Sequence, residues 1–174
     1  MFGFLGAIIA SGTALWIAYY VYPVQKKQDR ALKLQEEKAA VYRTFFDAAN
    51  DYYESLKDGW RRRNTDGFDA GYQKLLKAQE ALLLYAPANV VGVCKAFTQA
   101  LFEYRSHVRA ELNNVRPVKQ MKSTSRGNAY HLAEEARDNA LVKVRVDLWG
   151  CAEGDARDAV AGLRPKDETA DERD

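Results

Sequence analysis

The stretch NVVGVCKAFTQALFEYRSHVRAEL at residues 89–112 decides the fold class of this chain. Its apolar side chains recur at spacings of three and four residues, which places them on one stripe of an α-helix. This stripe consists of Val90, Cys94, Phe97, Leu101, Tyr104, Val108 and Leu112. No stretch of the chain alternates apolar and polar residues for long enough to indicate a β-strand. Because an amphipathic helix needs a partner to cover its stripe, we predict an all-α fold.

Three further segments show the same periodicity and extend the prediction to an antiparallel bundle of about four helices. One follows Pro23 and ends at Gly59, a candidate left-handed cap, and its polar start at 25–39 is interpreted as a stalk. A second runs from a candidate N-cap at Asp66 to Pro87, and the last runs from near Asn128 to about Trp149. Their stripes are Leu34, Val41, Phe45, Ala48, Tyr52 and Leu56; Phe68, Tyr72, Leu75, Leu76, Leu82 and Leu83; and Leu132, Ala133, Ala136, Ala140, Val144 and Leu148.

Residues Phe2 to Tyr22 carry no charge and predict one N-terminal transmembrane helix. At about 1.5 Å rise per residue, a helix of that length spans roughly the 30 Å hydrocarbon core. A cleavable signal peptide is the alternative, but no basic residue precedes the apolar run and no small-residue cleavage site follows it. The run ends in rings that favour a headgroup boundary, namely Trp16, Tyr19, Tyr20 and Tyr22.

The flanks of this segment predict its orientation. No basic residue precedes it, whereas Lys26, Lys27, Arg30 and Lys33 follow directly. Positive charge is retained on the cytoplasmic side, and anionic lipid attracts it there. We therefore expect a single-pass protein of the inner membrane, with the N-terminus outside and the domain in the cytoplasm.

Small residues recur every four positions within the predicted anchor, at Gly6, Ala10, Ala14 and Ala18. This spacing lets two helices approach closely in lipid, which indicates homo-oligomerisation through the anchor. The alternative, which we favour, is that Gly and Ala are simply frequent in transmembrane helices.

The predicted organisation is an anchor at 1–23, a cytoplasmic helical bundle with its stalk at 24–150, and a flexible acidic tail at 151–174. The tail has eight acidic residues against four basic ones, and Leu163 is its largest apolar side chain. Such a segment buries too little apolar surface to offset the entropy of ordering.

The composition excludes several function classes. The 26 basic and 24 acidic residues leave a net charge of +2, too small to imply a bulk polyanion partner. Cys94 and Cys151 make no disulfide framework. We find no glycine-rich phosphate loop, nucleophile elbow or paired-cysteine metal motif. The sequence therefore predicts no catalytic residue and no cofactor.

Two histidines with acidic neighbours are the one candidate metal site. Glu103 and Glu111 lie one turn either side of His107, and Glu134 and Glu135 follow His131. Histidine and carboxylate ligands suit zinc or iron. A di-iron bundle site needs Glu-x-x-His on two helices, however, and here the order is reversed. We interpret these side chains as a solvated helix face and predict no metal.

Two predicted connections are basic and would share the end of an up-down bundle that lies away from the membrane. Their residues are Arg61, Arg62, Arg63, Arg116, Lys119, Lys122 and Arg126. This basic patch suits nucleic acid or an acidic protein surface. The alternative, which we favour, is that the charges only solubilise loops.

The chain resembles a family of small, mostly uncharacterised bacterial helical proteins that often carry one N-terminal membrane helix. The resemblance covers 41–150 and rests on Val41-Tyr42-x-x-Phe45, Leu82-Leu83-Leu84-Tyr85-Ala86-Pro87, Val90-Val91 with Phe97, and Arg145-x-Asp147-Leu148. The last motif departs from the family pattern, because Val144 and Val146 flank Arg145 and Trp149 precedes Gly150. The family implies this architecture and transfers no catalytic residue.

The sequence thus favours a non-enzymatic, membrane-tethered helical module that binds or scaffolds another protein at the inner membrane face. A tether that binds nucleic acid or an acidic partner through its basic connections is the alternative. A metal-dependent enzyme is the third hypothesis.

Overall fold

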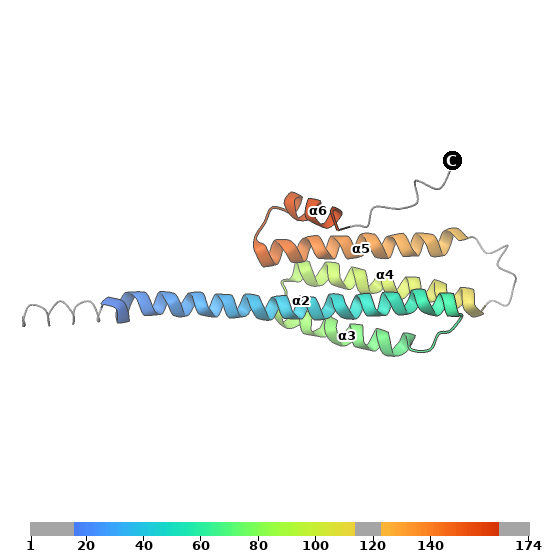
Figure 1. Cartoon of the computed structure of the whole chain (residues 1–174), viewed down its shortest axis with the longest axis horizontal. Helices are drawn as coiled ribbons and strands as arrows, with labels where there is room; N and C mark the ends of the chain where they lie inside the picture. Colours follow the sequence, from blue (N-terminus) through green and yellow to red (C-terminus); the bar gives the residue numbers. More distant parts are fainter. Residues whose placement is uncertain (1–15, 114–122, 164–174) are drawn as a thin grey trace, which may run out of the picture. The chain divides into compact units, whose positions relative to one another are not determined.

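The computed structural model describes residues 16–113 and 123–163, which form helices and no strand (Figure 1). The elements are the π-helical turn η1 (Ile17–Val21) and the α-helices α2 (Tyr22–Arg62), α3 (Phe68–Tyr85), α4 (Ala88–Asn113), α5 (Ser123–Trp149) and α6 (Glu153–Ala161). The all-α prediction is confirmed. The chain divides into two compact units, Met1–Ala39 and Ala40–Asp174.

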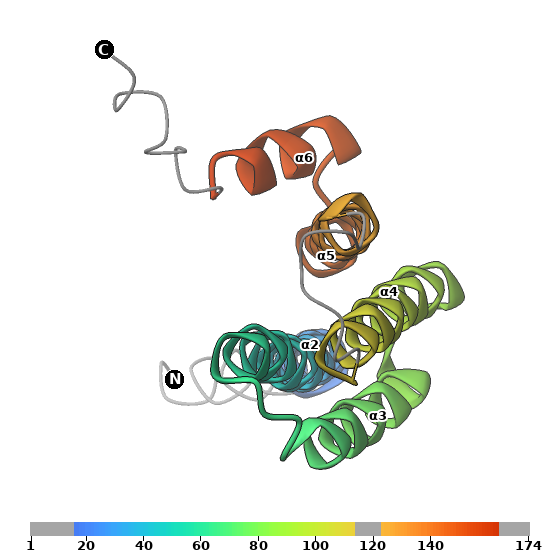
Figure 2. The ribbon, with the colours of Figure 1, turned by 90° about the vertical axis from the view of Figure 1, so that its right-hand side faces the viewer.

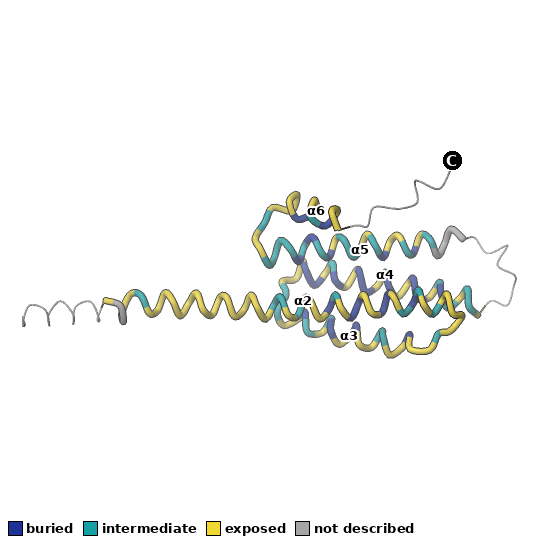
Figure 3. The backbone as a smooth tube through the Cα atoms, viewed as in Figure 1, coloured by how far each residue is buried: buried dark blue, intermediate teal, exposed yellow. Residues whose placement is uncertain are grey.

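In the first unit, η1 runs directly into α2, and Pro23 is the second residue of α2. Residues 22–37 are all exposed (Figure 3). Within the described residues, no helix combines the length and the apolarity that a membrane span requires. Residues 2–15 of the predicted anchor, with Gly6, Ala10 and Ala14, lie outside the described residues, so the anchor stays a prediction.

In the second unit, α2 from Ala40 onward, α3, α4 and α5 alternate in direction (Figure 1). The end-on view shows α2, α3 and α4 around a common centre, α5 packed on α4, and α6 packed on α5 (Figure 2). Tyr42 near the start of this part of α2 pairs with Asp147 near the end of α5, which confirms that these two helices are antiparallel.

The stripe predicted on residues 89–112 is the centre of the core. All of its members from Val90 to Val108 are buried, and Leu112 packs against them. Phe97 meets the ring of Phe45 edge to face with centroids 6.3 Å apart. Burial raises the pKa of the Cys94 thiol to about 12, so this cysteine is a protonated packing residue at neutral pH.

Three stripe residues are exposed, namely Leu34 at 50%, Leu83 at 56% and Leu132 at 53%. Leu34 lies in the exposed start of α2, and the other two were assigned to the wrong face. The neighbours Leu82 and Ala133 are buried instead. Successive helix positions differ by about 100° in direction, so in a run such as Leu82-Leu83-Leu84 only the packing decides which leucine faces inward.

The predicted helix ends also differ in three places, and one of them is the start of α5 at Ser123 instead of near Asn128. Gly59 lies inside α2, where an added Cβ would meet the Phe68 ring at 2.4 Å, so this glycine permits a close approach and caps nothing. The left-handed residues of the α2–α3 connection are Arg63 and Gly67, and Gly67, not Asp66, is the N-cap of α3. The end of the same helix before Pro87 is confirmed, since α3 stops at Tyr85.

The prediction of a flexible tail is wrong for Glu153–Ala161, which form α6. Ala156 and Val160 are buried in a small cluster with Val142 of α5. The helix is also tied to α5 by Lys143, whose Nζ lies 2.6 Å from the Glu153 carboxylate. Two small apolar residues one turn apart are enough here, because α5 provides the surface that covers them. Residues 164–174 lie outside the described residues.

Candidate functional site

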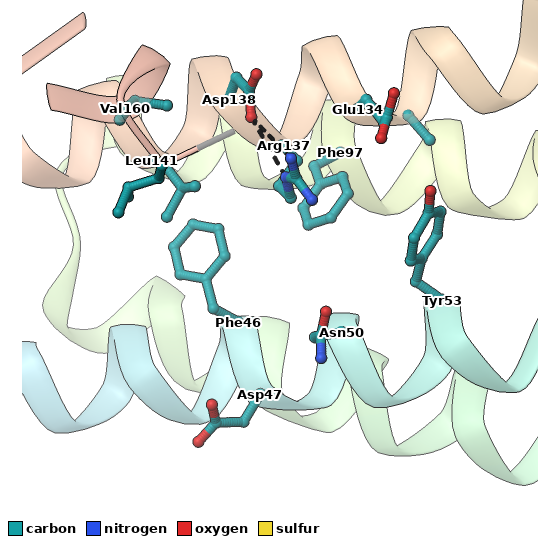
Figure 4. Close-up of a pocket in the computed structure, with 12 residues that line it drawn as sticks. Phe46, Asp47, Asn50, Tyr53, Phe97, Glu134, Arg137, Asp138, Leu141 and Val160 are labelled. Atoms are coloured by element: carbon teal, nitrogen blue, oxygen red, sulfur yellow. Dashed lines mark hydrogen bonds and ion pairs between the residues drawn. The ribbon is translucent and has the colours of Figure 1, made fainter. Parts of the chain in front are cut away.

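A groove opens between α2 and α5 in the second unit. Contacts between the two helices lie on either side of it. On one side, the Tyr42 hydroxyl donates a hydrogen bond to Asp147 Oδ2 at 2.6 Å. On the other side, the Tyr53 and Tyr130 rings lie with centroids 5.8 Å apart. Between these contacts lies a cavity of about 360 Å³, within the size range of sites that bind small molecules or a few partner side chains (Figure 4).

Helix α5 faces its neighbours with alanines, and one of them, Ala133, lines the groove. Ala129, Ala133 and Ala140 are buried, and Ala136 is half-buried. Small side chains let α5 approach α4 closely. They do not reach across to α2, so the space beside Ala133 stays open.

The floor and inner walls of the groove are apolar. Phe46 of α2 stacks on Phe97 of α4 with centroids 6.4 Å apart and planes 29° apart. Leu141 of α5 and Val160 of α6 extend this surface, and Tyr53 forms its other end. Burial, together with the neighbouring Tyr130 hydroxyl, raises the pKa of Tyr53, so its hydroxyl is neutral at physiological pH.

Polar groups line the sides of the groove. Asn50 and Arg137 point into the space between the helices, whereas the carboxylates of Asp47 and Asp138 are turned away from its centre (Figure 4). Arg137 already has a partner, because its Nε and Nη2 lie 3.3 and 3.2 Å from Asp138 Oδ1. Glu134, the third carboxylate, lies 3.7 Å from His131 Nδ1. The lining therefore contains three carboxylates and one guanidinium.

A second polar cluster lies on the α3 side of the unit and was not found from the sequence. Arg105 is only 6% exposed and pairs with Asp69, which Arg109 also binds at 2.9 Å. The Arg105 guanidinium lies 5.4 Å from the Tyr72 ring centroid. The hydrogen bond from Arg109 and the charge of Arg105 hold the pKa of the Asp69 carboxyl below its usual value. Each charge has a partner, so we assign this cluster to packing α4 on α3.

The predicted basic patch is described only in part. The side chains of Arg61, Arg62 and Arg63 are exposed, and the first two reach Asp58 at 3.9 and 4.0 Å. Helices α2 and α4 end at the same end of the unit, as the predicted topology requires (Figure 1). Arg116, Lys119 and Lys122 lie outside the described residues, and Arg126 lies in α5 without a described side chain.

The predicted membrane-interface residues are exposed wherever the structure describes them. Trp16, Tyr19, Tyr20 and Tyr22 are solvent-facing, and Trp16 lies beside Tyr20 with ring centroids 6.4 Å apart. Lys26, Lys27, Arg30 and Lys33 are exposed on α2. Ala18 lies in η1. This exposure is compatible with a lipid interface, which stays a prediction.

The histidines do not come together with their acidic neighbours as a metal site. Across 16–113 and 123–163, no group of three or more His, Cys, Asp or Glu side chains has the geometry to hold a metal ion. His131 is exposed and its contact with Glu134 is a surface pair one turn apart. His107 is half-buried on α4.

The sequence did not predict the groove. Of its lining residues, the sequence predicted Phe97 and Ala133 as core and named Glu134 as a candidate metal ligand, but it assigned none of them to a binding site. One signal was available: the stripe of the last predicted helix consists largely of alanine, whereas the facing stripes carry Phe45, Tyr52 and Phe97. A helix with a small-residue stripe fills less volume than its neighbours, which indicates either a close contact or a cavity.

Comparison of the chain with protein-family models, with curated proteins and with solved structures finds no match.

Proposed function

We propose that this chain is a single-pass, membrane-tethered helical module that binds another protein through the groove between α2 and α5. The uncharged stretch from Phe2 to Tyr22 and the basic residues after it support a tether at the inner membrane, with the helical unit in the cytoplasm. The groove is the observation that carries the binding role. It joins an apolar floor to polar sides, which is the anatomy of a protein-binding site.

The groove favours recognition over catalysis because of how its polar groups are engaged. Arg137 is paired with Asp138, and the Tyr53 hydroxyl is held neutral by burial. Neither group is arranged as an activated nucleophile beside a base. An interaction module needs only an apolar contact surface and polar groups that set orientation.

A matched pair of variants tests this proposal. Asn50→Trp places a large ring in the groove, whereas Asn139→Trp makes the same change at an exposed position of α5 that does not line it. The full chain, tagged and cross-linked in native membranes, should capture a partner protein as wild type and as Asn139→Trp. Asn50→Trp should lose most of that partner. Equal capture by both variants would rule out the groove as the binding site.

The tether and its orientation need a separate experiment. Protease added to intact spheroplasts should leave the helical unit uncut, because the unit is predicted to lie inside the cell. Disruption of the membrane should then expose it to digestion. Efficient cleavage before disruption would contradict the cytoplasmic orientation.

The alternative is a tether that binds nucleic acid through the basic patch, and the shared end of α2 and α4 favours it. A filter-binding series with the full chain should then show affinity that falls steeply with salt. Arg61→Ala with Arg62→Ala should reduce the slope. Salt-independent or absent binding would exclude this function.

A further inference from the structure

We infer that the occupant of the groove is a basic amphipathic helix of a partner protein. This inference rests on the proposed function and adds the chemistry of the partner. It follows from the charge on the sides of the groove, from the length of its apolar floor and from the positions of its carboxylates.

The charge of the groove favours a cationic partner. Asp47, Glu134 and Asp138 outnumber Arg137, which leaves the lining with a net charge of −2. The bordering helix α6 adds Asp155 and Asp158, whereas its Glu153 is paired with Arg157 and with Lys143 of α5. A phosphate backbone or an anionic lipid surface would be repelled here, whereas lysine or arginine side chains would be attracted.

The length of the groove suits a helix. The α2 wall extends from Phe46 to Tyr53 and the α5 wall from Ala133 to Leu141. At the helical rise these walls are about 10–12 Å long, which is roughly two turns. A partner helix lying along them would place apolar side chains at i, i+3 or i+4, and i+7 on the floor formed by Phe46, Phe97 and Leu141.

The positions of the carboxylates match the flanks of such a helix. Asp47 on α2 is exposed and Glu134 on α5 is half-buried, so each wall carries one accessible acid and the floor between them stays apolar (Figure 4). The side chain of Asp138 is only 13% exposed and is paired with Arg137. Lysine side chains flanking an apolar stripe extend their aliphatic stems over such a floor and place their ammonium groups at the edges. An acid in the middle of the floor would instead have to be desolvated.

The test uses two labelled peptides and the full chain in phosphatidylcholine nanodiscs. Both peptides are 18-residue helices with the same leucine stripe; one carries lysine on the flanks and the other glutamate. Fluorescence anisotropy measures binding, and empty nanodiscs measure the contribution of lipid. We expect the lysine peptide to bind the wild-type chain about tenfold more tightly than the glutamate peptide.

Two double variants locate the interaction. Asp47→Lys with Glu134→Lys reverses the charge of both walls and should weaken the lysine peptide about tenfold while strengthening the glutamate peptide. Asp66→Lys with Glu80→Lys makes the same change in net charge at exposed positions of the α2–α3 connection and α3. It should alter either affinity less than about twofold, since its charges lie away from the groove and exposed pairs are screened. Circular dichroism should show the same helix content in both double variants. If the groove variant loses helix content, Asp47→Asn with Glu134→Gln replaces it, and this neutral variant should shift the two affinities in the same direction.

The reversal of preference is the decisive result. If the wild-type chain binds both peptides equally, or the groove variant keeps the wild-type preference, the inference is wrong. The same holds if the control variant loses as much affinity as the groove variant. If neither peptide binds but Asn50→Trp still abolishes capture of a partner protein, the groove remains the binding site. Only the basic helix is then excluded as its occupant.

Discussion

Helices α4 and α5 bury stripes of similar length with opposite consequences. The α4 stripe carries Phe97, Leu101 and Tyr104, and it contributes rings and branched side chains to a filled core. The α5 stripe carries Ala129, Ala133 and Ala140, which are just as buried. Side-chain volume therefore separates the two: the large stripe fills the space among α2, α3 and α4, and the small stripe leaves the groove between α5 and α2.

The difference in side-chain volume between the two stripes also has a consequence for the proposed binding site. A cavity lined by Phe46, Phe97 and Leu141 forgoes the dispersion contacts that a filled core would make. A partner side chain that enters the groove restores those contacts. The same alanines that hold α5 close to α4 thus leave apolar surface available for binding.

The largest effect should come from truncating the large stripe. Phe97→Ala should destabilise the folded chain by about 3–5 kcal/mol, because it removes a buried ring that contacts both Phe45 and Phe46. A domain of this size has only about 5–15 kcal/mol of stability. Thermal unfolding followed by circular dichroism should show a clearly lower midpoint. A midpoint equal to that of the wild type would refute the central place of this stripe.

A smaller effect should follow from enlarging the small stripe, and it should depend on position. Ala140→Leu adds atoms where the stripe is fully buried, so it should cost about 1–3 kcal/mol. Ala133→Leu makes the same change beside the groove, where there is space, and should cost less than Ala140→Leu. Thermal unfolding of both variants measures the difference. Equal costs would mean that the groove is closed in solution.

Next comes the polar contact that joins the two helices at one end of the groove. Tyr42→Phe removes the hydroxyl that donates to Asp147, at an expected cost of about 1 kcal/mol and with the ring packing retained. Chemical denaturation resolves a change of this size. If stability is unchanged, the 2.6 Å hydrogen bond does not hold α2 to α5 in solution.

The smallest effects should come from residues outside both stripes. Leu83→Ala and Arg62→Ala alter exposed side chains, so each should change stability within about ±0.5 kcal/mol. Leu83→Ala is the sharper check, because the helical spacing of the sequence predicts that Leu83 is buried. A loss comparable to that of Phe97→Ala would mean that α3 is rotated relative to the structure.

The helices themselves were largely predictable from the sequence, because their signals are local. The apolar spacing from Val90 to Val108 predicted both α4 and its buried face. Pro87 predicted the end of α3, since the residue before a proline disfavours the helical conformation. The helix α6 was missed because Ala156 and Val160 are too few to signal a buried face without knowing that Val142 covers them.

The candidate site was not predictable in the same way. Phe46, Asn50 and Arg137 come from two helices far apart in the chain, and nothing in either segment indicates that they face each other. From the sequence alone, Arg105 is expected to be an exposed residue on a polar helix face. In the structure, Asp69 and the Tyr72 ring enclose it. Its burial depends on partners that only the packing of α3 on α4 supplies.

The amino-acid sequence by itself determined that this chain is helical, where most of its helices lie and which face of α4 is buried. Those properties depend on the periodicity of side chains along one segment, which is set by the geometry of a single helix. Only the tertiary structure decided that α5 leaves a groove beside α2, that acids line its edges and that Leu83 faces outward. These features depend on the volumes and distances between helices, which no single segment specifies.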